Sequence, residues 1–589
     1  MADKEREFGP WDPGLKSSIP RRLLPLSTMF RPEHVQTGFD EAHELADLSG
    51  LRARETVAFR PERLIAHELL IRVTADLSVP DGPDYEELGL NMRGMTARIF
   101  ETYVTPKLDQ LTSDHEQLVG RARDVMLSEL AALDQRQDRE ARQPEKRGFL
   151  SRLFGGSERP KSPKTSSERP GESPLQAAEA RWSLIEDPFE KACAEAVCTA
   201  VKAVLRTLGR LPADKSAIAR LAVNLFINGY GSAQLGRALN SIIEQAAKVE
   251  EYRFLPAQEK PVVMNVKGAS ASGKSTIRMH QRALAKKLGV PWEDFALVSP
   301  DYWRKYLLEY ESLGADHKYG AMLTGHELEI IDRKLDRYMA EKADLGTMPH
   351  LLIDRFRFDS FRADDEHELG SNLLTRFGHT VFMFFMVTPP EATVERAWSR
   401  GQTTGRFKAV DDLLAHNIEA YTGMPALFFA WALSDKKVHF EFLDNSVPKG
   451  ERPRTIATGW NRGMTVFDIE GMLNIERFKK VDIQATSPDQ IFGEASQAAE
   501  ANLDFLKQCC EQLGQVTFAE PASGEAYAVV EDRRWTWWSG SSSPVAKQTE
   551  ALLEAQGLMP PEKRGGKPPV VLSEQSSAET VDCNVGVIA

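Results

Sequence analysis

The segment 261–281, PVVMNVKGASASGKSTIRMHQ, constrains the fold of this chain more than any other stretch. Residues 262–266 are mostly apolar and predict a short buried strand. Residues 268–275 read GASASGKS and match the pattern G-x-x-x-x-G-K-[ST] without a gap. Residues 276–288 then have helical spacing up to Gly289. Strand, loop and helix in this order are the context of a phosphate-binding loop, so the segment predicts a nucleoside triphosphate site.

The chemistry of such a loop explains its residues. Gly268 and Gly273 permit backbone angles that turn successive N–H groups toward a phosphate, and the helix start adds further N–H donors. Lys274 supplies charge to the outer phosphates, and the Ser275 hydroxyl can bind Mg²⁺. The residues predicted to bind the nucleotide are therefore Gly268, Ala269, Ser270, Ala271, Ser272, Gly273, Lys274, Ser275 and Thr276.

Around this loop, residues 256–446 alternate between strand-like and helix-like patterns, which is typical of a doubly wound α/β domain with a parallel sheet. The predicted strands are 262–266, 295–298, 350–353, 381–387 and 438–443. Ligands of such sheets bind at the carboxyl ends of the strands, so polar residues that follow a strand are the best site candidates.

The remainder of the chain is divided by changes in composition. We expect a partly disordered N-terminus at 1–55, an α-helical domain at 56–134, a disordered linker at 135–173 and a helical bundle at 174–250. The P-loop domain is expected at 251–460, a small α+β region at 461–538 and a disordered tail at 539–589. The predicted fold class is thus an α/β sheet domain flanked by α-helical N-terminal domains.

The net charge and the cysteine content restrict the partners and the cellular setting that we expect for this protein. The net charge of −12 and the pI of about 5.7 argue against general nucleic-acid binding, so no nucleic-acid partner is expected. Five scattered cysteines without metal-like spacing favour a reduced, cytoplasmic setting. No apolar run approaches the ~20 residues of a membrane helix, so no transmembrane segment is expected.

Two strand ends carry carboxylates. Asp301 follows the second strand in VSPDYWRKYLLEY, where it could take the proton of a substrate hydroxyl that attacks a γ-phosphate. The alternative is that Asp301 caps the next helix. Arg304 could hold the acceptor or neutralise charge. Asp354 closes the third strand, where it could hold Mg²⁺-bound water or touch the substrate.

An arginine-rich segment follows the fourth strand, in VTPPEATVERAWSRGQTTGRFK. Arg396 and Arg400 are four residues apart on one helix face, and Arg406 follows a Gly-containing bend. A mobile lid with arginines is an expected means of neutralising charge in phosphoryl transfer. The alternative is a surface helix rich in arginine.

Taken together, these residues resemble the zeta-toxin family of P-loop kinases over about residues 255–446. The resemblance rests on the P-loop, Asp301 with Arg304 and the following LLEY, the lid ending in Gly405 and Arg406, and a late Asp-Asn-Ser at 444–446. One departure concerns the third strand, which ends in Glu followed by small residues in many relatives, whereas here Asp354 precedes Arg-Phe-Arg. About 250 residues also precede the kinase core here, and compact relatives lack them.

The resemblance implies a P-loop kinase-like fold and a toxin-type kinase that uses ATP and Mg²⁺. It implies that Asp301 is the catalytic base and that Lys274, Arg400 and Arg406, with Arg396, hold the phosphates. Arg304, Asp354 and Arg396 are the candidate substrate-binding residues, and Ser275 and Asp354 are the candidate metal ligands. Relatives phosphorylate a hydroxyl of UDP-N-acetylglucosamine or of another small molecule.

Two other functions remain open at this point. A regulatory NTPase would couple the nucleotide to the helical domains, but it would need a hydrolytic Glu after Asp354, and position 355 is Arg. A polynucleotide kinase would need a basic stripe with interleaved aromatic residues. In the resembled family a separate three-helix antitoxin blocks the nucleotide site, so residues 174–250 could inhibit in cis, or an antitoxin-like partner could bind.

Overall fold

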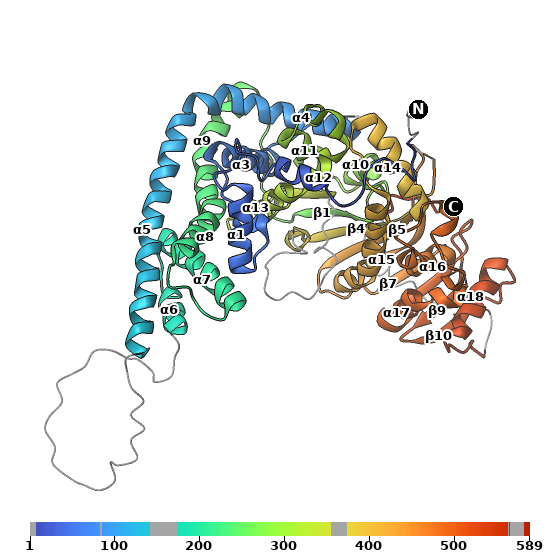
Figure 1. The fold of residues 1–589 in the computed structure, drawn as a ribbon. Coiled ribbons are helices and arrows are strands. Elements are labelled where there is room, and N and C mark those ends of the chain that lie inside the picture. The colour runs from blue at the N-terminus through green and yellow to red at the C-terminus, as the bar shows by residue number, and fades with distance from the viewer. Residues whose placement is uncertain are drawn as a thin grey trace, which may run out of the picture. The chain divides into compact units, whose positions relative to one another are not determined.

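A computed structural model describes residues 8–82, 85–141, 174–354, 374–448, 450–496, 498–562, 565 and 582–588 (Figure 1). The chain divides into two compact units, which we call the α/β unit and the helical unit. The α/β unit comprises Met1–Thr28, Leu70–Ile99 and Gln245–Ala589. The helical unit comprises Met29–Leu69 and Phe100–Glu244.

A ten-stranded sheet organises the described part of the α/β unit, in the order β10-β9-β8-β7-β6-β5-β4-β1-β3-β2. Its strands are β1 Val262–Lys267, β2 Phe295–Val298, β3 His350–Asp354, β4 Thr380–Val387, β5 Lys437–Asp444, β6 Arg454–Trp460, β7 Gly463–Val466, β8 Gln515–Ala519, β9 Ala526–Glu531 and β10 Arg534–Trp538. The first five strands pair only in parallel with one another. The prediction of a parallel α/β sheet is therefore confirmed, and each of its five strands lies within one residue of the expected bounds.

The order in which the chain adds strands to this sheet reverses at β1, although the strands themselves stay parallel. From β1 it passes to the edge strand β2, returns to β3 beside β1, and then crosses to β4 and β5 on the other side. Parallel pairing brings the carboxyl ends of all five strands to the same edge. A reversal of strand order is where α/β sheets open a crevice for ligands, and the P-loop after β1 lies at this reversal.

The C-terminal strands differ from the expectation of a separate small region at 461–538. β6 pairs antiparallel with β5, and β7 to β10 extend the same sheet further. β9 and β10 form an antiparallel hairpin. The physical reason for the extension is that β5 would otherwise leave a row of unpaired backbone groups at the sheet edge.

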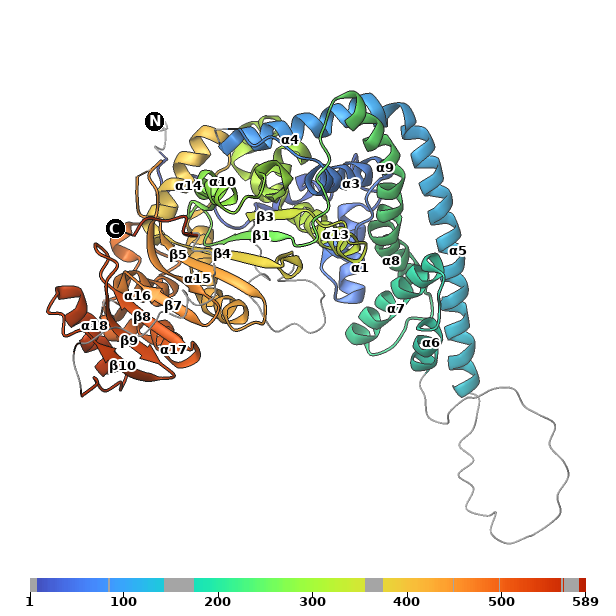
Figure 2. The same ribbon diagram turned by 180° about the vertical axis from the view of Figure 1, so that it is seen from behind.

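One face of the sheet is covered by helices that follow β4. Alternate residues of β4 and β5, among them Phe385 and Phe442, pack against Phe428 of α15 and Phe505 of α17. The stacked rings of Phe385 and Phe442 have centroids 4.7 Å apart. In Figures 1 and 2 the P-loop helix α10 lies across the strands from α15 and α16.

The helices of the α/β unit include α4 and the end of α3, which precede the P-loop domain in the chain. They are α4 Tyr85–Ile99, α10 Arg278–Lys287, α11 Arg304–Leu307, α12 Gly320–Leu323, α13 Gly325–Asp344, α14 Pro390–Thr404, α15 Val410–Ala432, α16 Ile469–Arg477, α17 Asp504–Gln512 and α18 Pro544–Ala555. The end of α3 (Pro61–Asp76) also belongs here: Asp76 accepts hydrogen bonds from Tyr338 and Lys342 of α13, each at 2.7 Å. The expected domain at 56–134 is therefore shared between the two units.

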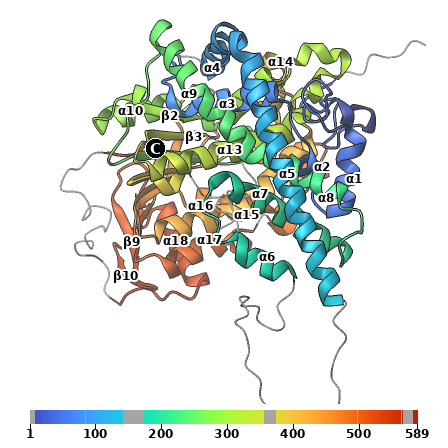
Figure 3. The ribbon, with the colours of Figure 1, turned by 90° about the vertical axis from the view of Figure 1, so that its left-hand side faces the viewer.

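The helical unit is built around the long helix α5, which lies alongside α7 and α8 (Figure 3). Its helices are α1 Phe39–Ser49, α2 Ala53–Thr56, the part of α3 up to Leu69, α5 Leu108–Ala141, α6 Pro174–Trp182, α7 Pro188–Leu208, α8 Ser216–Phe226 and most of α9 Ser232–Val249. Asp187 caps α7 by accepting a hydrogen bond from the Glu190 N–H at 2.8 Å. α5 extends seven residues into the interval expected as a linker, and residues 142–173 of that interval lie outside the described part.

The two ends of the chain contain more structure than expected. The interval 1–55 includes η1 (Arg21–Leu26), α1 and part of α2. The interval 539–589 includes α18, and Val585 is buried near its end. In both intervals scattered apolar residues pack against segments distant in the chain. The local composition does not predict this packing. None of the described helices combines the length and the apolar character needed to cross a lipid bilayer.

Candidate active site

The P-loop connects β1 to η5 (Lys274–Ile277) and α10, and close contacts explain both of its glycines. A Cβ at Gly268 would come within 2.8 Å of Met386 Cβ on β4. A Cβ at Gly273, where φ is +91°, would come within 2.0 Å of the Asn445 side-chain nitrogen. Asn445 and Thr388 both donate hydrogen bonds to the Ser272 carbonyl, at 2.8 and 2.9 Å. The loop is therefore held by the ends of β4 and β5.

Lys274 lies at the centre of the charged groups. Its Nζ donates to the carbonyls of Gly268 at 3.2 Å and Ala269 at 2.8 Å. Burial lowers the pKa of Lys274, the charges of Asp354 and Asp301 raise it, and those of Arg400 and Arg406 lower it. These charged side chains come from four separate segments of the chain, and Arg406 is also in direct contact with Asp301. The structure thus brings the predicted catalytic residues together.

The two candidate metal ligands are in direct contact. Ser275 Oγ donates to Asp354 Oδ2 at 2.8 Å. The sheet produces this contact because Asp354, the last residue of β3, pairs with Val266 of β1 just before the loop. Among the described residues, no group of three or more His, Cys, Asp or Glu side chains is placed so that it could hold a metal ion. One hydroxyl and one carboxylate fit Mg²⁺, which typically takes few protein oxygens and completes its shell with phosphate and water.

Asp301 is held between two arginines. It follows β2 in η7 (Pro300–Trp303), and its Oδ1 accepts from Arg304 Nε at 2.9 Å. Its Oδ2 lies 2.8 Å from Arg406 Nη2. Desolvation would raise the pKa of Asp301, but the charges of Arg406, Arg304 and Arg400 outweigh it and hold this pKa well below its usual range. Asp301 is therefore ionised at neutral pH.

The helix-capping alternative for Asp301 finds no contact to support it. The N-cap positions of η7 and α11 are Ser299 and Trp303, and neither has a side-chain cap. The Asp301 side chain remains 46% exposed while both its oxygens face cations. A carboxylate with two oxygens and about four acceptor positions can still receive a substrate hydroxyl in this arrangement.

Arg304 and Arg396, the candidate substrate-binding arginines, both donate hydrogen bonds to other parts of the protein. Arg304 Nη1 donates to the Ala321 carbonyl at 2.6 Å and to Thr324 Oγ1 at 3.1 Å, while its Nε binds Asp301. Arg396 Nη2 donates to the carbonyls of Asn445 at 2.6 Å and Val447 at 3.3 Å. These contacts fix Asp301 in one case and the loop after β5 in the other.

The remaining lid arginines, Arg400 and Arg406, act electrostatically on Lys274 and Asp301. α14 ends at Thr404, and its C-cap Gly405 has a φ of +74°, which turns the chain so that Arg406 leaves the helix direction. Arg406 is only 9% exposed and binds Asp301. Arg400 lowers the pKa values of both Lys274 and Asp301. The arginines that follow Asp354, at 355, 357 and 362, lie outside the described residues.

A cluster that the sequence did not single out adjoins these residues. Lys408 Nζ contacts His416 and lies 3.2 Å from Asp412 Oδ2. The positions 412 and 416 share a face of α15, as i,i+4 spacing requires, but nothing in their pattern connects them to the P-loop. Lys408 stands two residues after Arg406 and could have been noticed as a further lid cation.

Comparison with known proteins adds no assignment to this geometry. The chain matches no known family model, and a search of curated proteins finds no significant match.

Proposed function

We propose that this protein is an ATP-dependent phosphotransferase that moves the γ-phosphate to a hydroxyl of a small molecule, on a P-loop kinase-like domain. The observation that carries the proposal is the position of Asp301. Its carboxylate is ionised, is fixed by Arg304 and Arg406, and acts electrostatically on Lys274 of the P-loop. A carboxylate opposite a phosphate-binding lysine is the arrangement that hydroxyl phosphorylation needs.

The donor would be bound by the P-loop amides and Lys274, with Arg400 and Arg406 of the lid over the outer phosphates. Ser275 and Asp354 would hold Mg²⁺, which neutralises charge on the β- and γ-phosphates when bound. The lid arginines come from one helix end, so a small movement of α14 and the residues after it would change the charge around the γ-phosphate.

The acceptor oxygen forms a bond to the γ-phosphorus, the bond from this phosphorus to the β,γ-bridging oxygen breaks, and ADP leaves. The acceptor proton passes to the Asp301 carboxylate and then to solvent, giving a phosphate ester. Because the pKa of Asp301 is low, it is a weak base, and its main contribution is to orient the hydroxyl. The proton moves late, when bonding to phosphorus has made the hydroxyl more acidic.

The acceptor class follows from the resemblance stated above. A zeta-toxin-like kinase would act on a nucleotide sugar such as UDP-N-acetylglucosamine. Arg304 and Arg396 are engaged with the protein itself, so acceptor recognition would depend on other residues near Asp301. UDP-N-acetylglucosamine is therefore the first acceptor to test, followed by a metabolite extract.

The test compares variants with labelled ATP, Mg²⁺ and these acceptors. Asp301→Asn should reduce turnover by about 10²-fold or more, because the acceptor hydroxyl loses its orienting partner, and should retain ATP binding. Lys274→Ala should lose ATP binding. Asp435→Asn is the matched control, because Asp435 is exposed at the opposite end of β5 and should behave as the wild type.

Two results would contradict the proposal. Turnover of Asp301→Asn within a few-fold of the wild type would remove Asp301 from the reaction. Steady ATP hydrolysis that no acceptor changes would instead favour a regulatory NTPase.

A further inference from the structure

Lys408, Asp412 and His416 form a compact cluster at the start of α15. Lys408 Nζ contacts His416 Nδ1 and lies 3.3 Å from His416 Nε2, and it pairs with Asp412 at 3.2 Å. His416 Nε2 is 3.5 Å from Asp412 Oδ1. Burial and the charge of Lys408 hold the pKa of His416 well below its usual range, so the ring is neutral and accepts from the lysine. The lysine is thus held by a carboxylate and a neutral imidazole.

Lys408 follows Arg406 by two residues, and Arg406 is in direct contact with Asp301 of the proposed transfer site. The pKa of Lys408 responds to Arg400 and Asp301, and the pKa of His416 responds to Lys274, Asp301 and Arg304. These partners come from α14, η7, α11 and the P-loop. The lid therefore carries Lys408 close to the pair of Arg406 and Asp301 in the proposed transfer site.

A buried lysine beside arginines is costly to maintain. Lys408 is 16% exposed, and burial lowers its pKa to about 8, with Asp412 opposing this change and Arg400 adding to it. Among the described residues, the carboxylate paired directly with it is that of Asp412. A third lid cation in this position has a clear use when an anion occupies the space in front of it, because a phosphate would restore its full charge.

We propose that Lys408 is a phosphate-contacting residue of the lid, which binds the γ-phosphoryl group together with Arg406 and is positioned by His416 and Asp412. The inference rests on the proposed function, since it concerns the donor of the same site. His416 and Asp412 are positioning residues here, because they act through the lysine.

The test is the relative affinity for ATP and ADP in the presence of Mg²⁺, measured by calorimetry without any acceptor. Only ATP carries the γ-phosphate, so Lys408→Met should weaken ATP binding by about 10- to 100-fold and leave ADP binding unchanged. Unchanged ADP affinity also shows that the variant is folded. Lys286→Met is the matched control, because Lys286 is exposed on α10.

The pH dependence gives a second readout. The charges that face Lys408 are Asp412 and His416 on α15, Arg400 on α14 and Asp301 on η7. Lys408 loses its proton as the pH rises past about 8, so the wild-type preference for ATP over ADP should fall between pH 7 and pH 9.5. Lys408→Arg, which stays charged, should keep its preference across this range.

The outcomes separate this inference from the proposed function. Equal ATP affinity in wild type and Lys408→Met would overturn the role of Lys408 while leaving the kinase proposal intact. A Lys408→Met variant that loses ATP and ADP binding equally would show a structural role only. If the wild type bound neither nucleotide, both proposals would fail together.

Discussion

Asp301 illustrates how single residues acquire their properties from distant parts of this chain. Its two oxygens face Arg304, three residues away, and Arg406, more than a hundred residues away. Desolvation favours the neutral acid, yet the arginine charges reverse this preference and lower its pKa. The low pKa follows from this pairing, and a group of this kind positions a hydroxyl more effectively than it removes a proton.

At the same scale, the contact between Ser275 and Asp354 predicts a dependence on Mg²⁺. Asp354→Asn should raise the Mg²⁺ concentration needed for half-maximal ATP binding by at least about tenfold, because the loss of even an outer partner of a metal site commonly costs this much. Ser275→Ala should act in the same direction. The measurement is ATP affinity as a function of Mg²⁺ concentration.

Asp435→Asn serves again as the control for this series, since the same change is made at an exposed carboxylate. An unaltered Mg²⁺ requirement in both Asp354→Asn and Ser275→Ala would mean that the hydrogen-bonded pair is structural.

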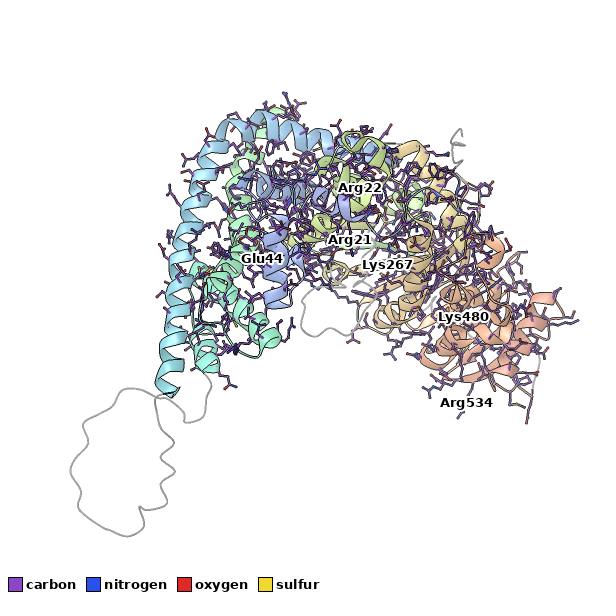
Figure 4. All side chains as sticks on the ribbon, in the orientation of Figure 1. Arg21, Arg22, Glu44, Lys267, Lys480 and Arg534 are labelled. Atoms are coloured by element: carbon purple, nitrogen blue, oxygen red, sulfur yellow. The ribbon has the colours of Figure 1, made fainter. Side chains whose placement is uncertain are left out.

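At the scale of elements, the N-terminal segment 8–28 lies against the lid. Leu15 packs with Phe407 and Ala409, which immediately follow Arg406, and Ser17 hydrogen-bonds Asp411. The same segment also contacts η8 (Tyr310–Tyr319): Lys318 donates to the Pro13 carbonyl at 2.7 Å. Arg22, labelled in Figure 4, pairs with Asp316 of η8 at 2.6 Å. The segment therefore connects the lid to the region beside Asp301.

This connection predicts that the segment limits lid motion. Leu15→Asp should remove about 1.5–3 kcal/mol of apolar burial, so amide hydrogen exchange across 404–411 should become about 10- to 100-fold faster. Lys16→Asp is the matched control, because Lys16 is next to Leu15 in the chain and its side chain is exposed. Equal exchange in the two variants would show that the lid is held without the segment.

At the scale of the whole chain, residues near the C-terminal end complete the face of the sheet that carries Glu441. The carboxylate of Glu441 on β5 accepts hydrogen bonds from the N–H groups of Val585 at 2.8 Å and Gly586 at 3.0 Å, and from Thr455 Oγ1 at 2.6 Å. The N–H of Thr455 donates to the carbonyl of Val587 at 2.7 Å, so this segment pairs with the start of β6. Burial raises the pKa of Glu441 to about 7.

The raised pKa of Glu441 gives a pH effect on stability. Between pH 4.5 and 7 the folded state keeps a proton that the unfolded state releases, so stability from this group falls as the pH rises, on the order of 3 kcal/mol over the window. Glu441→Gln should lower stability at low pH, because an amide donates where the carboxyl accepts, but should remove this slope. Urea unfolding followed by tryptophan fluorescence measures it, since nine of the ten tryptophans lie in the α/β unit.

The difference in slope between wild type and variant is the quantity that matters, because other groups titrate in both. Parallel curves for wild type and Glu441→Gln would mean that Glu441 is not the source of the pH dependence.

The prediction that residues 174–250 inhibit the nucleotide site in cis stays a prediction. It is tested by the ATP affinity of a variant without the helical unit.

Local pattern alone was enough to place the P-loop, the five parallel strands and the candidates Asp301, Asp354 and Arg406. The reason is that short apolar runs, a glycine-lysine loop and strand-end polar residues each express a constraint within a few residues. Parallel strands then bring those ends together whatever the intervening sequence.

Packing between distant segments decided the rest. The hydrogen bonds that Arg304 and Arg396 donate to the protein join residues 17 and 49 positions apart, and the contact of Lys408 with His416 depends on how the chain folds back at the start of α15. The extension of the sheet by β6 to β10 and the burial of Val585 likewise depend on edges that exist only after the first strands have paired. A residue's own sequence neighbours carry no information about such partners, because side-chain contacts are set by the tertiary structure.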